Sequence, residues 1–281
     1  MTQERRPDDA IQAETLVASR PSKPSEGIGL KDDFIMALRF FSRLPTGGSP
    51  HQLPDLNRIA MALPLASVVI GIGPALLLIG GVLLGLPVYF AASLAVGAMI
   101  VATGAMADDA LADAADGLFG GHTVERRLEI MKDSRHGTYG VAALALFILL
   151  RVTAIGAMAA VNPLAAGSVW LAAGIVGRSG ALWLAVALPA ARSFGAAATV
   201  GRLGKMGFAV GIVFSAVLLF LLAGPSTSLL GLALAVVLAV AVIGGWTWVC
   251  KRLVGGQSGD LIGALGALAE IAVLAALVSF V

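Results

Sequence analysis

Three aspartates with helical spacing carry the clearest chemical signature in the sequence. Asp109, Asp113 and Asp116 are separated by four and three residues, so a helix places them on one face. No Lys or Arg lies between them, and like charges on one helical face repel each other. A divalent cation relieves this repulsion, and oxygen ligands favour Mg²⁺, with Mn²⁺ as the second choice. We therefore predict that the three aspartates bind a metal; a merely solvated acidic face is the competing interpretation.

Glycines and cations follow the acidic face. Gly117, Gly120 and Gly121 would permit close approach of the backbone to a phosphate. Three basic residues downstream suit phosphate oxygens: Arg127, Lys132 and Arg135. Membrane topology also accounts for some of these charges. Carboxylates, glycines and cations together indicate metal-assisted phosphoryl chemistry.

A second polar stretch lies between two apolar segments near the C-terminus. It combines two cations, three glycines and one acid: Lys251, Arg252, Gly255, Gly256, Gly259 and Asp260. An ordinary turn accounts for this composition, but glycine-rich backbone with cations also suits a phosphate or a nucleotide. The stretch is therefore a second candidate for substrate binding.

Three charged residues fall inside apolar segments: Arg151, Arg178 and Glu270. Charges within a membrane are costly and are functional candidates by default. We predict that Arg178 binds substrate or pairs with another helix, and a structural Arg–Glu pair is the alternative for the group. The histidines do not form a metal pattern, and His136 is interpreted as a loop residue with phosphate binding as the minor alternative.

The composition indicates a protein of a lipid bilayer and not a soluble domain. Charged residues make up 13% of the chain, hydrophobic residues make up 58%, and the mean hydropathy is +0.92, whereas soluble domains contain about 25% charged residues. Apolar runs of roughly twenty residues are long enough to cross about 30 Å of hydrocarbon. Cys250 is the only cysteine, which excludes an internal disulfide, and a net charge of +2 does not suggest nucleic acid.

The apolar runs predict an all-α, polytopic bundle of about seven transmembrane helices. We place them near residues 60–84, 87–107, 138–161, 166–188, 208–223, 229–249 and 261–280. Residues 1–33 are expected to form a disordered cytoplasmic tail, and 34–281 an integral membrane catalytic domain. Residues 34–44 suit either a helix lying in the membrane interface or a first turn of the bundle. The basic connections fall on one side, which predicts a cytoplasmic N-terminus.

Several motifs of the sequence resemble those of a known family. The run from Asp109 to Gly117, followed by Arg127 to Gly140, is similar to the motifs of adenosylcobinamide-GDP ribazoletransferases, the cobalamin synthases. Residues 40–45 (Phe-Phe-Ser-Arg-Leu-Pro) resemble that family's opening motif, and residues 251–260 resemble its closing one. Ala107 and Ala110 depart from the family pattern, which has His and Gly at these positions.

The resemblance implies a Mg²⁺-dependent transferase of the bacterial inner membrane with its active site on the cytoplasmic side. Its substrates would be adenosylcobinamide-GDP and α-ribazole or the 5′-phosphate of α-ribazole. GMP would leave, and the acceptor would be joined to the corrinoid by a phosphodiester. Membrane lipid would surround the protein, and the resemblance allows either a monomer or an oligomer.

Asp133 is the candidate for the base that takes a proton from the acceptor. It follows Glu129 by four residues, so both could face the aspartates if the chain reverses at Gly120 and Gly121. Asp116 would act in catalysis as well as in metal binding. The remaining predicted residues would hold substrate: Arg127, Lys132, Arg135, Arg178, Lys251, Arg252 and Asp260.

Two other functions stay open from the sequence. A CDP-alcohol phosphatidyltransferase-like lipid enzyme uses similar chemistry, and Asp113, Asp116, Gly117, Glu129 and Asp133 loosely resemble its motif at too short a spacing. An ion-coupled transporter could use the aspartates as an ion site. The acids cluster at one membrane face, however, and no matched pair of interrupted helices is evident.

Overall fold

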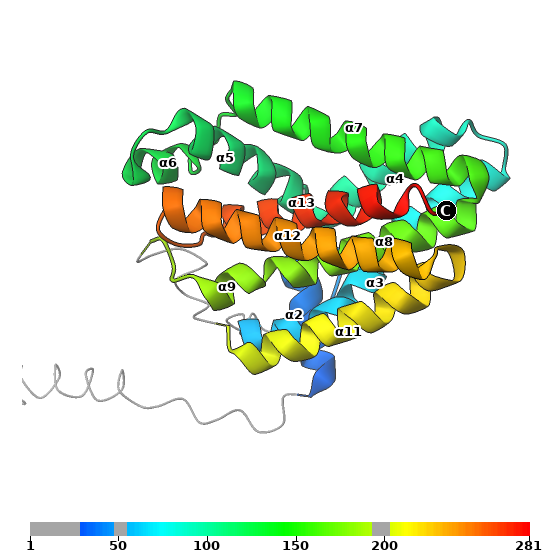
Figure 1. Ribbon diagram of the computed structural model, residues 1–281, viewed down its shortest axis with the longest axis horizontal. Coiled ribbons are helices and arrows are strands. Elements are labelled where there is room, and N and C mark those ends of the chain that lie inside the picture. Colours follow the sequence, from blue (N-terminus) through cyan, green and yellow to red (C-terminus); the bar gives the residue numbers. More distant parts are fainter. Residues whose placement is uncertain (1–28, 48–54, 193–202) are drawn as a thin grey trace, which may run out of the picture.

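The computed structural model describes residues 29–47, 55–192 and 203–281. Across these ranges the regular elements are helices, and the only strand-like pairing there is one isolated bridge between Ala190 and Gln257. The predicted all-α membrane bundle is confirmed (Figure 1). Most of the tail predicted over residues 1–33 lies outside the described residues, and the first described helix, α2 (Leu30–Phe41), begins inside that range.

Six stretches are long and apolar enough to cross a membrane. They comprise α3 (Leu56–Leu83), α7 (Thr138–Val161), α8 (Pro163–Ala181) with α9 (Trp183–Ala187), α11 (Lys205–Ala223) with the 3₁₀ turn η1 (Gly224–Ser226), α12 (Leu229–Leu253) and α13 (Gly259–Leu277). A seventh crossing requires α4 (Val88–Thr103) and α5 (Met106–Gly120) to be counted together, although they are bent by 87°.

The bend between α4 and α5 redirects the acidic helix. Gly104 and Ala105 both adopt left-handed backbone conformations, with φ of 63° and 58°. Arg43 packs against this corner, where a Cβ on Gly104 would lie 2.7 Å from Arg43 Cγ, and the Arg43 N–H donates to Ala102 O at 2.8 Å. The aspartates therefore sit on a separate helix and do not continue the apolar span predicted over 87–107.

Helix α2 packs on α3 as part of the bundle. Ala37 and Leu38 are buried, and Arg58 of α3 forms an ion pair with Asp33. These contacts favour the bundle-helix alternative for residues 34–44. They also place Phe40 and Phe41 beside the corner that Arg43 covers.

Helix α8 is the most buried of the spanning helices and lies at the centre of the bundle. Its small residues let α13 approach closely, since a Cβ at Gly177 would lie 2.6 Å from Gly266 O. Close contact of this kind is the main source of helix association in lipid, where no hydrophobic force acts between helices. Figure 1 shows α5, α6 (Val124–Ile130) and α9 at the same end of the bundle as the C-terminal end of α12.

Candidate active site

Asp116 fastens the start of α7 to α5. Its two carboxylate oxygens accept the backbone N–H groups of Gly137 and Gly140, at 2.6 and 2.8 Å. A Cβ would lie 2.6 Å from this carboxylate at Gly137 and 2.3 Å from it at Gly140, so both positions require glycine. The sequence grouped Asp116 with Asp109 and Asp113 as a metal ligand. In the structure Asp116 is buried and serves as an anchor for the backbone.

Asp109 and Asp113 instead share a site with His136. His136 Nε2 lies 3.7 Å from Asp109 Oδ1, and its Nδ1 lies 3.6 Å from Asp113 Oδ1. One potential ligand atom of each residue lies within 4.8 Å of the other two. His136 was predicted as a loop residue and not as part of a metal cluster, because the histidines share no spacing pattern. Its position depends on Gly137, the next residue, which Asp116 holds in place.

Asp133 forms an ion pair with its neighbour Arg135. The guanidinium donates to the Asp133 carboxylate at 3.0 and 2.7 Å, and these bonds lower the pKa of Asp133 to about 2. A general base works best with a pKa near the working pH. The predicted roles of Asp133 as base and Arg135 as phosphate ligand stay untested, but the pair satisfies both groups and weakens the case for the base.

The glycines after the acidic face serve helix packing. A Cβ at Gly117 would lie 2.4 Å from Met131 Cγ, and one at Gly121 would lie 2.6 Å from Arg127 Cγ. Arg127 also donates to Leu253 O at 2.8 Å, which links α6 to the end of α12. These contacts bring α6 against α5, and they account for Gly117 and Gly121 without a bound phosphate.

The second polar stretch divides between surface and interior. Lys251 and Arg252 are exposed at the end of α12, where Arg252 lies over the Trp248 ring at 5.2 Å. Asp260, in the first turn of α13, is partly buried. Lys132 and Arg192 are near enough to act on the Asp260 carboxylate electrostatically. Of the predicted residues in this stretch, Asp260 is therefore the one that joins the acidic site.

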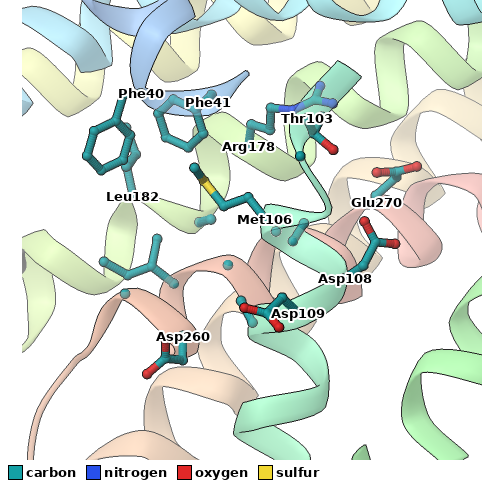
Figure 2. Close-up of a pocket in the computed structure, with 18 of the residues that line it drawn as sticks. Phe40, Phe41, Thr103, Met106, Asp108, Asp109, Arg178, Leu182, Asp260 and Glu270 are labelled. Carbon is teal, nitrogen blue, oxygen red and sulfur yellow. The ribbon is translucent and has the colours of Figure 1, made fainter. Parts of the chain in front are cut away.

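A cavity of about 350 Å³ opens beside the acidic helix and runs between α2, α5, α8 and α13. Asp109 and Asp260 lie toward one end of it, and Phe40, Phe41 and Arg178 lie toward the other (Figure 2). Asp109 thus belongs both to the cluster with Asp113 and His136 and to the wall of the cavity.

A buried ion network forms one wall of the cavity. Arg151 donates to both oxygens of Glu270 at 2.9 Å and lies 3.4 Å from Asp108 Oδ1. Trp170 Nε1 donates to Glu270 at 3.1 Å. The structural Arg–Glu pair that the sequence left open is present, and it joins α5, α7, α8 and α13. These charged side chains need partners because a buried, unpaired charge destabilises the folded protein by several kcal/mol.

Arg178 also lies at this wall, but its guanidinium has fewer hydrogen-bond partners than that of Arg151. Its guanidinium donates to Met99 Sδ at 3.4 Å, and Asp108 and Glu270 act on it from farther away. No ion pair to Arg178 forms within the described part of the chain. An oxygen or nitrogen acceptor in the cavity would complete its hydrogen bonding.

Comparison with known proteins shows the family of the chain. A family model described as cobalamin-5-phosphate synthase matches residues 33–278. The adenosylcobinamide-GDP ribazoletransferase of Azorhizobium caulinodans is 43% identical over 242 residues, covering 85% of this chain and 92% of its own. The proteins of the same name from Xanthobacter autotrophicus and Brucella anthropi are 40% and 39% identical, covering 89% and 88% of this chain and 97% and 96% of their own. No solved structure matches the chain. The chain belongs to the cobalamin-5-phosphate synthase family.

Proposed function

We propose that this protein joins a ribazole-type acceptor to adenosylcobinamide-GDP at the site formed by α5, α13 and the start of α7. A ribose hydroxyl of the acceptor forms a bond to the phosphorus nearest the corrinoid. The bond from that phosphorus to the GMP oxygen breaks, and GMP leaves. The observation that carries the proposal is the position of Asp109, which connects an acidic, metal-binding type of cluster to a cavity of small-molecule size.

The residues of the cluster fit a divalent cation. Asp109 and Asp113 offer hard carboxylate oxygens, which suit Mg²⁺ or Mn²⁺. His136 adds a nitrogen, which Mn²⁺ accepts more readily than Mg²⁺ does. When bound, such an ion would neutralise charge on the diphosphate and stabilise the departing GMP. Asp116 would support the cluster by holding Gly137, and with it His136, in place.

The remaining groups position the substrates and move the proton. Asp260 lines the cavity beside Asp109, accepts a hydrogen bond from Ser258 Oγ at 3.4 Å and forms no ion pair with another described residue, whereas Asp133 pairs with Arg135, so we propose Asp260 as the proton acceptor in preference to Asp133. Lys132 and Arg192 both act electrostatically on Asp260, and we propose that they bind the diphosphate oxygens. Lys251 and Arg252, exposed at the nearby end of α12, are proposed to contact the nucleotide part of the donor.

We further propose that the site faces the cytoplasm from the inner membrane of a bacterium. The connection between α6 and α7 carries Lys132 and Arg135, and the end of α12 carries Lys251 and Arg252. Both segments lie at the end of the bundle that also holds α5 and α6 (Figure 1). Lys and Arg are enriched in cytoplasmic loops. A reporter that is active only in the cytoplasm should therefore work in the α5–α7 connection and fail in the short turn between α7 and α8.

The test uses purified protein in liposomes with adenosylcobinamide-GDP, α-ribazole and Mg²⁺. GMP release should require both substrates and should stop when EDTA removes the metal. A parallel reaction replaces α-ribazole with a diacylglycerol acceptor. Transfer to the lipid alcohol, or GMP release without any acceptor, would contradict the proposal.

A further inference from the structure

We propose that the cavity between α2, α5, α8 and α13 holds the planar base of the ribazole-type acceptor, and that Arg178 donates a hydrogen bond to its unsubstituted ring nitrogen. The inference rests on the proposed function and assigns one part of one substrate to a defined place. The base of α-ribazole is a dimethylbenzimidazole. One of its ring nitrogens carries the ribose, and the other offers a single lone pair.

The size of the cavity limits which part of the substrates it can enclose. A volume of about 350 Å³ lies at the small end of the range for ligand pockets. The cavity is too small to enclose a corrinoid ring system with its side chains, whereas a bicyclic base and its ribose fit. The corrinoid must then stay outside, next to the bilayer or the aqueous face.

The walls of the cavity suit a flat apolar ring. Phe40 and Phe41 lie edge to face, with ring centroids 5.0 Å apart, and Leu182 lies near them (Figure 2). Further apolar groups also line the cavity: Leu56, Met106, Ala181 and Ile262. A methyl-substituted aromatic ring would bury its edges against these side chains, and aromatic contacts with the phenylalanines would add to the burial.

The polar groups at the inner end match one acceptor atom. Arg151 and Trp170 already engage Glu270, and Arg151 also pairs with Asp108. Arg178 is then a donor beside this network whose recorded hydrogen-bond partner is a sulfur, Met99 Sδ, and not an oxygen or nitrogen of another described residue. Dimethylbenzimidazole presents one acceptor nitrogen and no N–H. Guanine would bring an N–H and an amino group, and at this end of the cavity both oxygens of Glu270 already accept hydrogen bonds from Arg151.

The orientation also serves the chemistry. With the base beside Arg178, the ribose extends toward the end of the cavity that Asp109 and Asp260 line (Figure 2). That end adjoins the cluster of Asp109, Asp113 and His136. A ribose hydroxyl would therefore meet the diphosphate where charge neutralisation and a proton acceptor are available.

The experiment compares the binding of two ligands by calorimetry, without adenosylcobinamide-GDP, in protein reconstituted into nanodiscs. One ligand is α-ribazole, and the other is the matching dimethylindole riboside, in which C–H replaces the free ring nitrogen. The wild-type protein should bind α-ribazole about tenfold or more tightly than the indole, the ratio expected for a hydrogen bond to a charged donor. Arg178→Met should bind both ligands equally, while Thr153→Val, on the exposed side of α7, should keep the wild-type preference.

Two results would overturn the inference. The first is equal binding of both ligands by the wild-type protein, a measurement that needs no variant. The second is an Arg178→Met protein that keeps the wild-type preference for α-ribazole over the indole, which would show that Arg178 does not donate to the ring nitrogen. Because these titrations involve no turnover, they are separate from the proposed function, which fails if the wild-type protein makes no phosphodiester product.

Discussion

Replacement of Asp116 by Asn distinguishes an anchor from a metal ligand. The carboxylate accepts two backbone N–H groups, at 2.6 and 2.8 Å. Asn keeps one oxygen, so one bond is lost and an amide N–H faces a backbone N–H. A hydrogen bond to a charged group contributes about 1.5–3 kcal/mol, and a neutral one about 0.5–1.5 kcal/mol. The loss of one bond and the weakening of the other should lower the free energy of unfolding by about 2–4 kcal/mol.

The effect on activity should follow from the displaced loop. Without the anchor at Gly137, His136 no longer has a fixed place beside Asp109 and Asp113, so turnover should fall. The Mg²⁺ concentration that gives half-maximal activity should change less than in a variant of a direct ligand. Thermal unfolding in detergent and a Mg²⁺ titration of GMP release measure the two effects separately.

Glu125→Gln is the matched control, because Glu125 is an exposed carboxylate at the start of α6. It should leave both the stability and the Mg²⁺ titration unchanged. The anchoring role is refuted if Asp116→Asn unfolds at the wild-type temperature while its Mg²⁺ requirement rises tenfold or more. That result would restore Asp116 to the metal site that the sequence predicted.

Four further substitutions test neighbouring parts of the site. Asp113→Asn should raise the Mg²⁺ requirement with little change in unfolding temperature, and an unchanged Mg²⁺ titration would argue against the metal cluster. Asp260→Asn should lower turnover by a factor of about a hundred or more, typical of a lost general base, whereas Asp133→Asn should have a smaller effect, and the reverse order would return the base to Asp133. Glu270→Gln leaves Arg151 with Asp108, at 3.4 Å, as its remaining ion-pair partner among the described residues; breaking such a buried pair costs about 3–5 kcal/mol, and a wild-type unfolding temperature would contradict the ion network.

The bundle could be predicted from the sequence because length and apolarity decide which segments cross a bilayer. The corner between α4 and α5 could not. Its left-handed pair includes Ala105, a residue type that rarely adopts this conformation, and tertiary contacts with Arg43 hold the corner. A continuous span over 87–107 was therefore the natural prediction.

The acidic face could be predicted only in part. Helical spacing places Asp109, Asp113 and Asp116 on one side of α5, but it does not say what each carboxylate meets. Asp116 meets two N–H groups that arrive from more than twenty residues further along the chain. His136 joins the cluster by the same long-range contact, so spacing carried no signal for it. The cavity could not be predicted from local sequence patterns either, because the side chains that line it come from α2 and α13, which lie far apart in the sequence.

The most direct test of the central claim is the origin of the new phosphodiester oxygen. The purified protein is given adenosylcobinamide-GDP, α-ribazole and Mg²⁺ in ¹⁸O-enriched water, and the corrinoid product and GMP are analysed by mass spectrometry. Direct transfer predicts a corrinoid that carries the acceptor, with no ¹⁸O in it and none in GMP. Incorporation of ¹⁸O into either product, or a corrinoid that lacks the acceptor, would show attack by water and contradict the account.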